Sequence, residues 1–236
     1  MRKSRFETTR WSLVLAAGGA QDAADALATL CEIYWYPLYA YARRQGQDPE
    51  DAKDLTQSFF ALLLERRDVR AVRRERGRFR SFLLASMRHF LLNQAAYRRA
   101  QKRGGGRPAL PLEFDTAEGR YLREPADADT PETIFDRRWA LTVLDRVFQR
   151  LRRDWTDAGK LAQFDHLKIC LTGDQPPGGY AQVARELGTS EGAVKIAVHR
   201  LKRQYHRVLR EEIGATVSTD EAIDDEIRYL LDSLQR

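Results

Sequence analysis

Basic side chains crowd one stretch in the last quarter of the chain. Ammonium and guanidinium groups donate hydrogen bonds to phosphates and to base edges, so their chemistry is nucleic-acid recognition. A DNA-processing enzyme would need clustered carboxylates or a nucleophile, but Asp and Glu stand at predicted helix starts and on polar faces, without metal-ligand spacing. We therefore expect no catalytic residue, metal or cofactor. The basic residues are Lys195, His199, Arg200, Lys202, Arg203 and Arg207.

The stretch that must position these side chains, from Tyr180 to Tyr205, predicts a helix, a tight turn and a second helix. Gly188 stands where the first helix must end in a left-handed conformation, and Thr189 or Ser190 can cap the second. Counted from Tyr180, a small residue falls fifth, glycine ninth and an apolar residue fifteenth, as in a DNA-binding helix-turn-helix. The apolar positions are Val183, Ala184, Leu187, Val194, Ala197, Val198 and Leu201.

An ordinary helical hairpin packed in a core is the alternative interpretation of this spacing, and the basic outward face argues against it. The first turn of such a second helix normally points into the major groove of DNA. Arg200 and Arg203 are expected to contact phosphates. The candidate base readers are Ser190, Glu191, Ala193, Lys195, Ile196 and His199.

Charge is unevenly spread along the chain. The 236 residues carry a formal charge of +6, with 43% apolar residues, which is ample for a core. Residues 66–107 contain 14 Lys and Arg against 2 acidic residues, a local charge of +12, so the rest carries −6. Such a concentration of positive charge indicates a second nucleic-acid surface.

From the cysteines and the N-terminal stretch we expect a cytoplasmic protein. Cys31 and Cys170 lie far apart in apolar helical patterns, without zinc-ligand spacing, so we expect buried, reduced thiols. Basic residues followed by the apolar run WSLVLAA resemble a signal peptide, but that run is at the lower limit of length. No run approaches membrane-spanning length, so no membrane contact is expected.

Helical periodicity continues through most of the chain. One helix is expected up to about Tyr41, with a kink or break at Pro37, and another starts at Asp48 and Pro49. A third begins at Arg78 after a basic loop, and a long helix starts at Thr130 and Pro131. A further helix runs through residues 161–171, and an amphipathic helix follows Ser218.

Almost nothing in the sequence predicts a strand, so the expected fold class is all-α. The triple glycine at residues 104–106 and the prolines that follow predict a flexible linker between two helical domains. We expect a first domain at residues 1–103, a linker at 104–129, a helix-turn-helix domain at 130–214 and a C-terminal amphipathic helix at 215–236.

The order of these motifs resembles the sigma-70 superfamily, in particular the small extracytoplasmic-function (ECF) sigma factors of bacteria. DAKDLTQSFFALLLER, residues 51–66, resembles the family's polymerase-binding helix, and GRFRSFLLASMRHFLLNQ, residues 77–94, resembles its promoter-opening helix. The helix-turn-helix resembles the module that binds the −35 element. The resemblance covers nearly the whole chain and implies a sigma-2-like domain followed by a sigma-4-like domain.

The resemblance implies a promoter-specificity subunit of RNA polymerase, which is not an enzyme. Its partners would be core polymerase, through the β′ clamp helices and the β flap, and promoter DNA, with a Ser/Thr kinase or an anti-sigma factor as regulator. The implied polymerase contacts are Asp51, Asp54, Gln57, Ser58 and Phe60. The implied −10 contacts are Arg78, Arg80, Arg88, His89, Asn93, Arg98 and Arg99, with Phe79 and Phe82 either assisting strand separation or forming core.

Three features depart from the family pattern. Lys53 and Ser58 stand where relatives commonly have Glu, so we hypothesise that phosphorylation of Thr56 or Ser58 restores the missing acidity and activates polymerase binding. His89 replaces a common Asn, which bears on −10 preference. Ala197 replaces a common Arg, which predicts a weaker phosphate contact.

Two questions remain open at this level. The C-terminal helix after Ser218 either closes the core of the second domain or regulates, by packing against the first domain or a partner. The alternative function is a helix-turn-helix repressor or activator that acts without core polymerase and whose first domain senses a ligand or dimerises. The basic loop before the third helix argues against that alternative.

Overall fold

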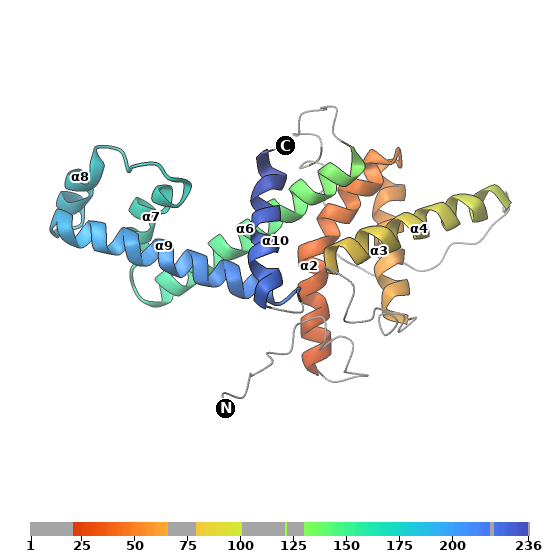
Figure 1. Ribbon diagram of the computed structural model, residues 1–236, viewed down its shortest axis with the longest axis horizontal. Helices are drawn as coiled ribbons and strands as arrows, with labels where there is room; N and C mark the ends of the chain where they lie inside the picture. Colours follow the sequence, from red (N-terminus) through yellow and green to blue (C-terminus); the bar gives the residue numbers. More distant parts are fainter. Residues whose placement is uncertain (1–20, 66–78, 101–120, 122–129, 218–219, 236) are drawn as a thin grey trace. The chain divides into compact units, whose positions relative to one another are not determined.

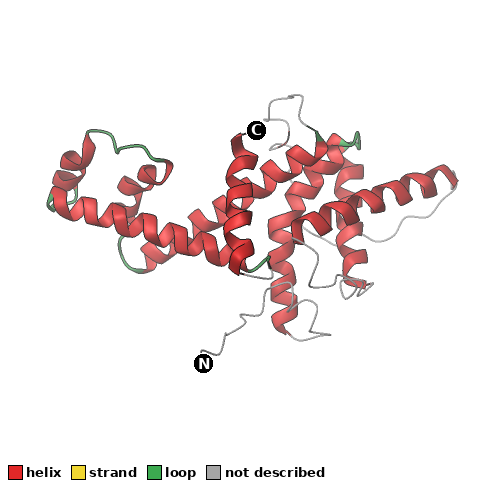
Figure 2. Cartoon of the chain, in the orientation of Figure 1, coloured by secondary structure: helices red, strands yellow, loops and turns green. Residues whose placement is uncertain are grey.

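The computed structural model describes residues 21–65, 79–100, 121, 130–217 and 220–235. Every regular element in these ranges is helical and none is a strand (Figure 2), which confirms the all-α prediction for this part of the chain. The elements labelled in Figure 1 are α2 (Gln21–Arg44), α3 (Pro49–Glu65), α4 (Phe79–Ala100), α6 (Pro131–Asp157), α7 (Leu161–Leu167), α8 (Gly179–Glu186), α9 (Glu191–Gly214) and α10 (Asp220–Gln235). A 3-10 helix, η2 (Lys168–Thr172), follows α7.

The chain divides into two compact units, residues 1–141 with 214–236, and residues 142–213. The sequence predicted the boundary at residues 104–129, which lie outside the described residues except for Tyr121. The division instead falls within α6, because Phe135 and Trp139, near its start, are fully buried in the first unit. The C-terminal helix α10 also belongs to the first unit and does not close the core of the second.

Helix α2 is the central helix of the first unit. Every residue from Ile33 to Ala42 is buried, and a helix that is buried on all sides must be surrounded by other elements. The helix runs without a break through Pro37. Pro inside a helix costs about 3 kcal/mol or more, so we attribute the continuity to this burial, which favours the helix over an exposed turn.

Helix α3 begins as the sequence predicted. The Asp48 carboxylate accepts a hydrogen bond from the backbone N–H of Asp51 at 2.8 Å, and Pro49 takes the first helical position. Its buried side chains include Ala52, Leu55 and Phe59. The Phe59 ring lies 5.7 Å from that of Phe90 on α4, which ties the two helices together.

The second unit packs the later part of α6 against α7, α8 and α9. Trp155 and Phe164 have ring centroids 5.9 Å apart, and the indole N–H of Trp155 donates to Gln204 on α9 at 2.9 Å. Arg150 of α6 pairs with Glu211 of α9 at 2.6 Å. These contacts hold α9 along α6, so the scaffold of the second unit is a helical core beneath its helix-turn-helix.

No helix among the described residues is both long enough and apolar enough to span a membrane.

Candidate nucleic-acid interface

The turn between α8 and α9 has the geometry that the sequence predicted. Gly188 has φ +62, the left-handed conformation that a residue with a Cβ rarely adopts, and Thr189 N–H donates to the Ala184 carbonyl at 2.8 Å. Of the two predicted caps, Ser190 is the one observed, because its hydroxyl accepts from Ala193 N–H at 3.2 Å. The turn therefore sets α9 at a defined angle to α8.

Packing divides α9 into a buried face and an exposed face. Val194, Val198 and Leu201 are buried in the second unit, as is Ala197, which is only 8% exposed. Ala197 therefore packs into the core of the second unit, where the Arg of the family pattern would have to bury a longer, charged side chain. All eight residues predicted to contact the −35 element are exposed: Ser190, Glu191, Ala193, Lys195, Ile196, His199, Arg200 and Arg203.

Charged groups on the exposed face of α9 differ in how they are held. Lys195 pairs with Glu191 one turn earlier at 2.8 Å, and this contact raises the pKa of Lys195. Arg200 and Arg203 have no ion pair among the described residues, so their guanidinium groups are available to phosphates. Ile196 is an exposed apolar side chain, 55% accessible, between these charges. The face offers a ligand cations together with the apolar side chains of Ala193 and Ile196.

Helix α4 carries the second predicted DNA-binding surface. Arg88, His89 and Asn93 are exposed, and the helix contains four Arg and no acidic residue. Phe79 is buried beside Tyr34, with ring centroids 5.3 Å apart, and Phe82 is half-buried, which favours the core interpretation for Phe79. Arg78 lies outside the described residues, as do the side chains of Arg98 and Arg99.

Arg80 does not occupy the exposed position that the sequence analysis gave it. It is 4% exposed, and its guanidinium pairs with Asp136 of α6 and with Glu226 of α10. The reason lies in its register, because Arg80, Leu83, Met87 and Phe90 follow one another at spacings of three and four on the buried face of α4. In this conformation Arg80 cannot reach a phosphate.

Sequence reasoning missed this cluster, although a signal for it existed. Asp136 precedes buried Ala140 and Val143 at helical spacing, and Glu226 stands between Ile223 and Leu230 in the buried stripe of α10. Charged residues that stand in the apolar stripes of three different helices are expected to form ion pairs with one another, because an unpaired buried charge is destabilising.

The residues predicted to bind core polymerase lie on different faces of α3. Asp54 and Ser58 are exposed and Asp51 is half-buried. Gln57 and Phe60 are instead buried, at 5% and 3% exposure, because they adjoin the apolar stripe that contains Thr56 and Phe59. The surface of α3 that a partner can reach is therefore narrower than predicted, and it is centred on Asp54 and Ser58.

The two proposed phosphorylation positions also separate. Thr56 is 0% exposed, and its hydroxyl donates to the Ala52 carbonyl at 2.7 Å. Ser58 is exposed. A kinase can reach the hydroxyl of Ser58 in this structure, whereas Thr56 would first have to leave the core.

Among the described residues, no group of three or more His, Cys, Asp or Glu side chains could hold a metal ion. Both cysteines are free thiols, and Cys170 is buried as expected, whereas Cys31 is only half-buried. Comparison with known proteins gives no match: no protein-family model, no curated protein and no solved structure is significantly similar to this chain.

Proposed function

We propose that this protein is a sigma factor of the extracytoplasmic-function type, a non-enzymatic subunit that directs core RNA polymerase to promoters from the cytoplasm. The observation that carries the proposal is the presence of two DNA-compatible faces on separate compact units. One is the exposed face of α9, and the other is the acid-free exposed face of α4.

The helix-turn-helix would bind the −35 element as duplex. Its geometry supports this role because Gly188 and Ser190 fix the turn, and the exposed side chains of the first turns of α9 have the donor groups that base edges accept. Ile196 can pack against the methyl group of thymine. Arg200 and Arg203 would hold the DNA backbone.

Helix α4 would engage the −10 element. Arg88 supplies a phosphate contact, and His89 and Asn93 supply hydrogen-bonding groups on the same exposed face. Strand separation costs a few kcal/mol per extruded base, which stacking and polar contacts must offset. Because the charged residues of α4 are all Arg, the helix can attract the phosphates of a DNA strand that has separated from the duplex.

Helix α3 would bind the β′ clamp helices of core polymerase through Asp54 and Ser58. We further propose that phosphorylation at Ser58 strengthens this contact, because it adds roughly 1.5 to 2 negative charges to a surface that carries Lys53 where an acidic residue would favour basic clamp helices. The burial of Thr56 makes it the weaker candidate.

Run-off transcription with purified core polymerase tests the proposal. The expected result is initiation at a selected promoter that depends on this protein. The second candidate function, a repressor or activator with a helix-turn-helix, rests on the same exposed face of α9. It predicts binding to duplex DNA without any association with core polymerase, and that outcome would replace the first proposal.

A further inference from the structure

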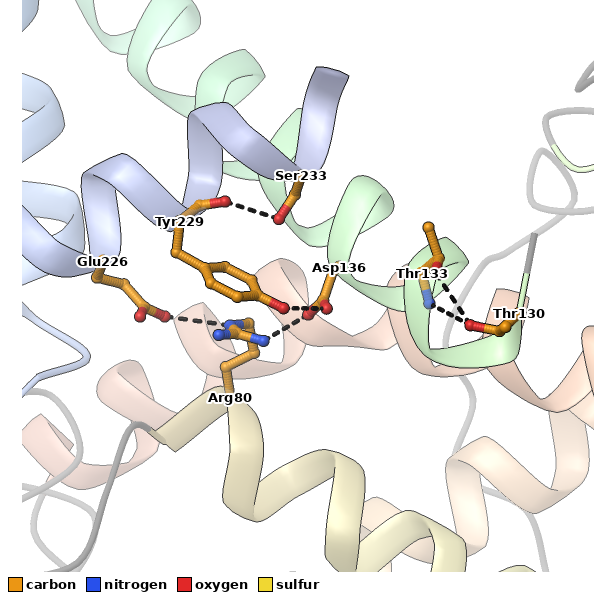
Figure 3. Close-up of polar contacts among 7 residues, drawn as sticks. All are labelled: Arg80, Thr130, Thr133, Asp136, Glu226, Tyr229 and Ser233. Atoms are coloured by element: carbon orange, nitrogen blue, oxygen red, sulfur yellow. Dashed lines mark hydrogen bonds and ion pairs between the residues drawn. The ribbon is translucent and has the colours of Figure 1, made fainter. Parts of the chain in front are cut away.

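Arg80 lies where three helices of the first unit meet. It stands in the first turn of α4, and its Nε lies 3.1 Å from Glu226 Oε1 of α10 (Figure 3). Its Nη1 donates to Asp136 Oδ1 of α6, and Asp136 Oδ2 accepts from the Tyr229 hydroxyl at 2.5 Å. The same guanidinium is 4.1 Å from the centre of the Tyr229 ring and 5.0 Å from that of Trp139. Two of these four neighbours come from α10.

The guanidinium keeps its charge in this buried place. Burial lowers the pKa of Arg80, but the carboxylates of Asp136 and Glu226 raise it by more, so the net direction is upward. One buried cation thus faces two carboxylates. The hydrogen bond from Arg80 Nη1 to Asp136 Oδ1 would hold Arg80 in place if Glu226 left.

The stripe by which α10 packs is half polar. Its buried side chains are Ile223, Glu226, Leu230 and Ser233, and the Ser233 hydroxyl returns a hydrogen bond to its own helix at the Tyr229 carbonyl. Buried ion pairs contribute little net stability relative to apolar packing of the same shape. A helix that only completed a core would gain more from an apolar residue at position 226. The polar stripe is better suited to a contact that forms and dissociates.

Charge complementarity indicates which ligand competes for Arg80. Helix α10 contains six acidic residues and a single Arg, whereas α4 contains four Arg and no acid. A carboxylate on an acidic helix offers a guanidinium the same oxygen acceptors as a phosphate of a nucleic-acid backbone. Glu226 therefore occupies the position that a DNA phosphate would take at the start of α4.

We propose that α10 is an autoinhibitory helix that covers the start of α4, and that single-stranded DNA displaces it by taking over Arg80 from Glu226. This inference rests on the proposed function, since it assigns a closed state to the −10 surface of α4. When α10 leaves, Arg80 stays oriented by Asp136 and joins Arg88 on one DNA-binding helix.

The first experiment measures the binding of a fluorescein-labelled 12-residue oligothymidylate to the full chain by anisotropy. Glu226→Gln is expected to raise the affinity about tenfold, the order of one hydrogen bond to a charged group, and to steepen the salt dependence by about 0.7 log units per log unit of salt, as for one further phosphate contact. Glu221→Gln, an exposed position on the same helix, makes the same charge change and is expected to alter the affinity less than about twofold.

A double variant assigns the gain to Arg80. Arg80→Gln combined with Glu226→Gln removes both charges, and the affinity is expected to return to the wild-type value. A gain that survives in the double variant, or one that Glu221→Gln reproduces, overturns the role of Arg80.

The second experiment uses the wild-type protein, so that it does not depend on how the variants fold. Hydrogen exchange of α10 is expected to accelerate when the protein is saturated with the oligonucleotide. Unchanged protection of α10 at saturation overturns the inference, as does failure of the oligonucleotide to bind. If run-off transcription succeeds on the same sample, either of these two results rejects only the autoinhibitory role of α10. If transcription also fails for both the wild type and Glu226→Gln, the proposed sigma-factor function is rejected as well.

Discussion

Arg80 Nε and Glu226 Oε1 lie 3.1 Å apart although 146 positions separate the two residues in the chain. This ion pair joins the helix proposed to hold the −10 strand to the C-terminal helix, inside one compact unit. It therefore places the end of the chain in a position to affect how the first unit works, and its energetic role can be measured.

Removing one charge from this cluster should destabilise the protein more than neutralising the whole cluster, which also contains Asp136. Glu226→Ala leaves Arg80 with one buried carboxylate partner fewer, and we expect stability to fall by about 3 kcal/mol. Replacing the whole cluster, with Arg80→Met, Glu226→Leu and Asp136→Asn, should cost much less, because no buried charge is then left without a counter-charge. Chemical denaturation followed by tryptophan fluorescence measures both, with Trp139 close to the site. Equal destabilisation of the two variants would contradict this account.

Lys195→Ala should weaken binding to the −35 element and leave binding to core polymerase intact. Its ion pair with Glu191 is exposed, so removal of the pair should change stability by no more than about 1 kcal/mol. Removal of one hydrogen-bonding side chain from a base edge in the groove should weaken binding by about 1–3 kcal/mol. The measurement is a promoter titration with and without core polymerase.

Lys168→Ala is the matched control for this variant. Lys168 is an exposed ammonium paired at 2.9 Å with Asp165, outside the helix-turn-helix, so its removal should leave promoter affinity unchanged. Failure of the Lys195→Ala protein to bind core polymerase would count against separate roles for the two units.

Ser58→Glu should strengthen binding to core polymerase, and Thr56→Glu should unfold part of the first unit. Glu at position 58 adds a charge to an exposed face, whereas Glu at position 56 puts a carboxylate into a site that is 0% exposed. Affinity for core and the thermal midpoint are to be measured for both variants, with Ser58→Gln as the uncharged control. Unchanged affinity in the Ser58→Glu protein would remove the phosphorylation hypothesis.

Cys31 should resist alkylation at mildly alkaline pH. Burial, followed by the charge of Glu32, raises the pKa of its thiol from 9.0 to about 11. Because the thiolate is the reactive form, two units lower its population about 100-fold at pH 8 relative to a free cysteine. Reaction should accelerate as the pH rises toward 11 and should be fast at pH 8 in denaturant. Iodoacetamide labelling of the Cys170→Ser protein measures this, and fast labelling of the native protein at pH 8 would contradict the raised pKa of the half-buried Cys31 thiol.

Local rules predicted the elements well. The cap at Asp48, the start of α6 after Thr130, and the left-handed Gly188 all follow from a few neighbouring residues, and the structure confirms them. The exposed face of α9 follows from apolar spacing alone, because alternate burial on a helix repeats every three or four residues. Helix caps, turn glycines and the apolar face of a helix therefore depend on the local sequence and not on the rest of the fold.

Partners distant in the chain were not predicted. Arg80 was expected at a DNA surface, and Gln57 and Phe60 at a polymerase surface, but all three are buried. Their burial depends on which neighbouring helix covers them, and spacing within one helix does not specify that neighbour. The division within α6 was not predicted for the same reason, because only packing places the start of α6 and all of α10 with the first unit.

The sequence by itself determined the helical character of the described residues, the helix-turn-helix turn and the basic exposed face of α9, because helix periodicity, caps and turn glycines act over a few residues. Only the tertiary structure decided that the acidic C-terminal helix joins the first unit and that Glu226 holds Arg80. The physical reason is that a buried charge requires a counter-charge close to it in space, and the helix that supplies this counter-charge can come from any part of the chain.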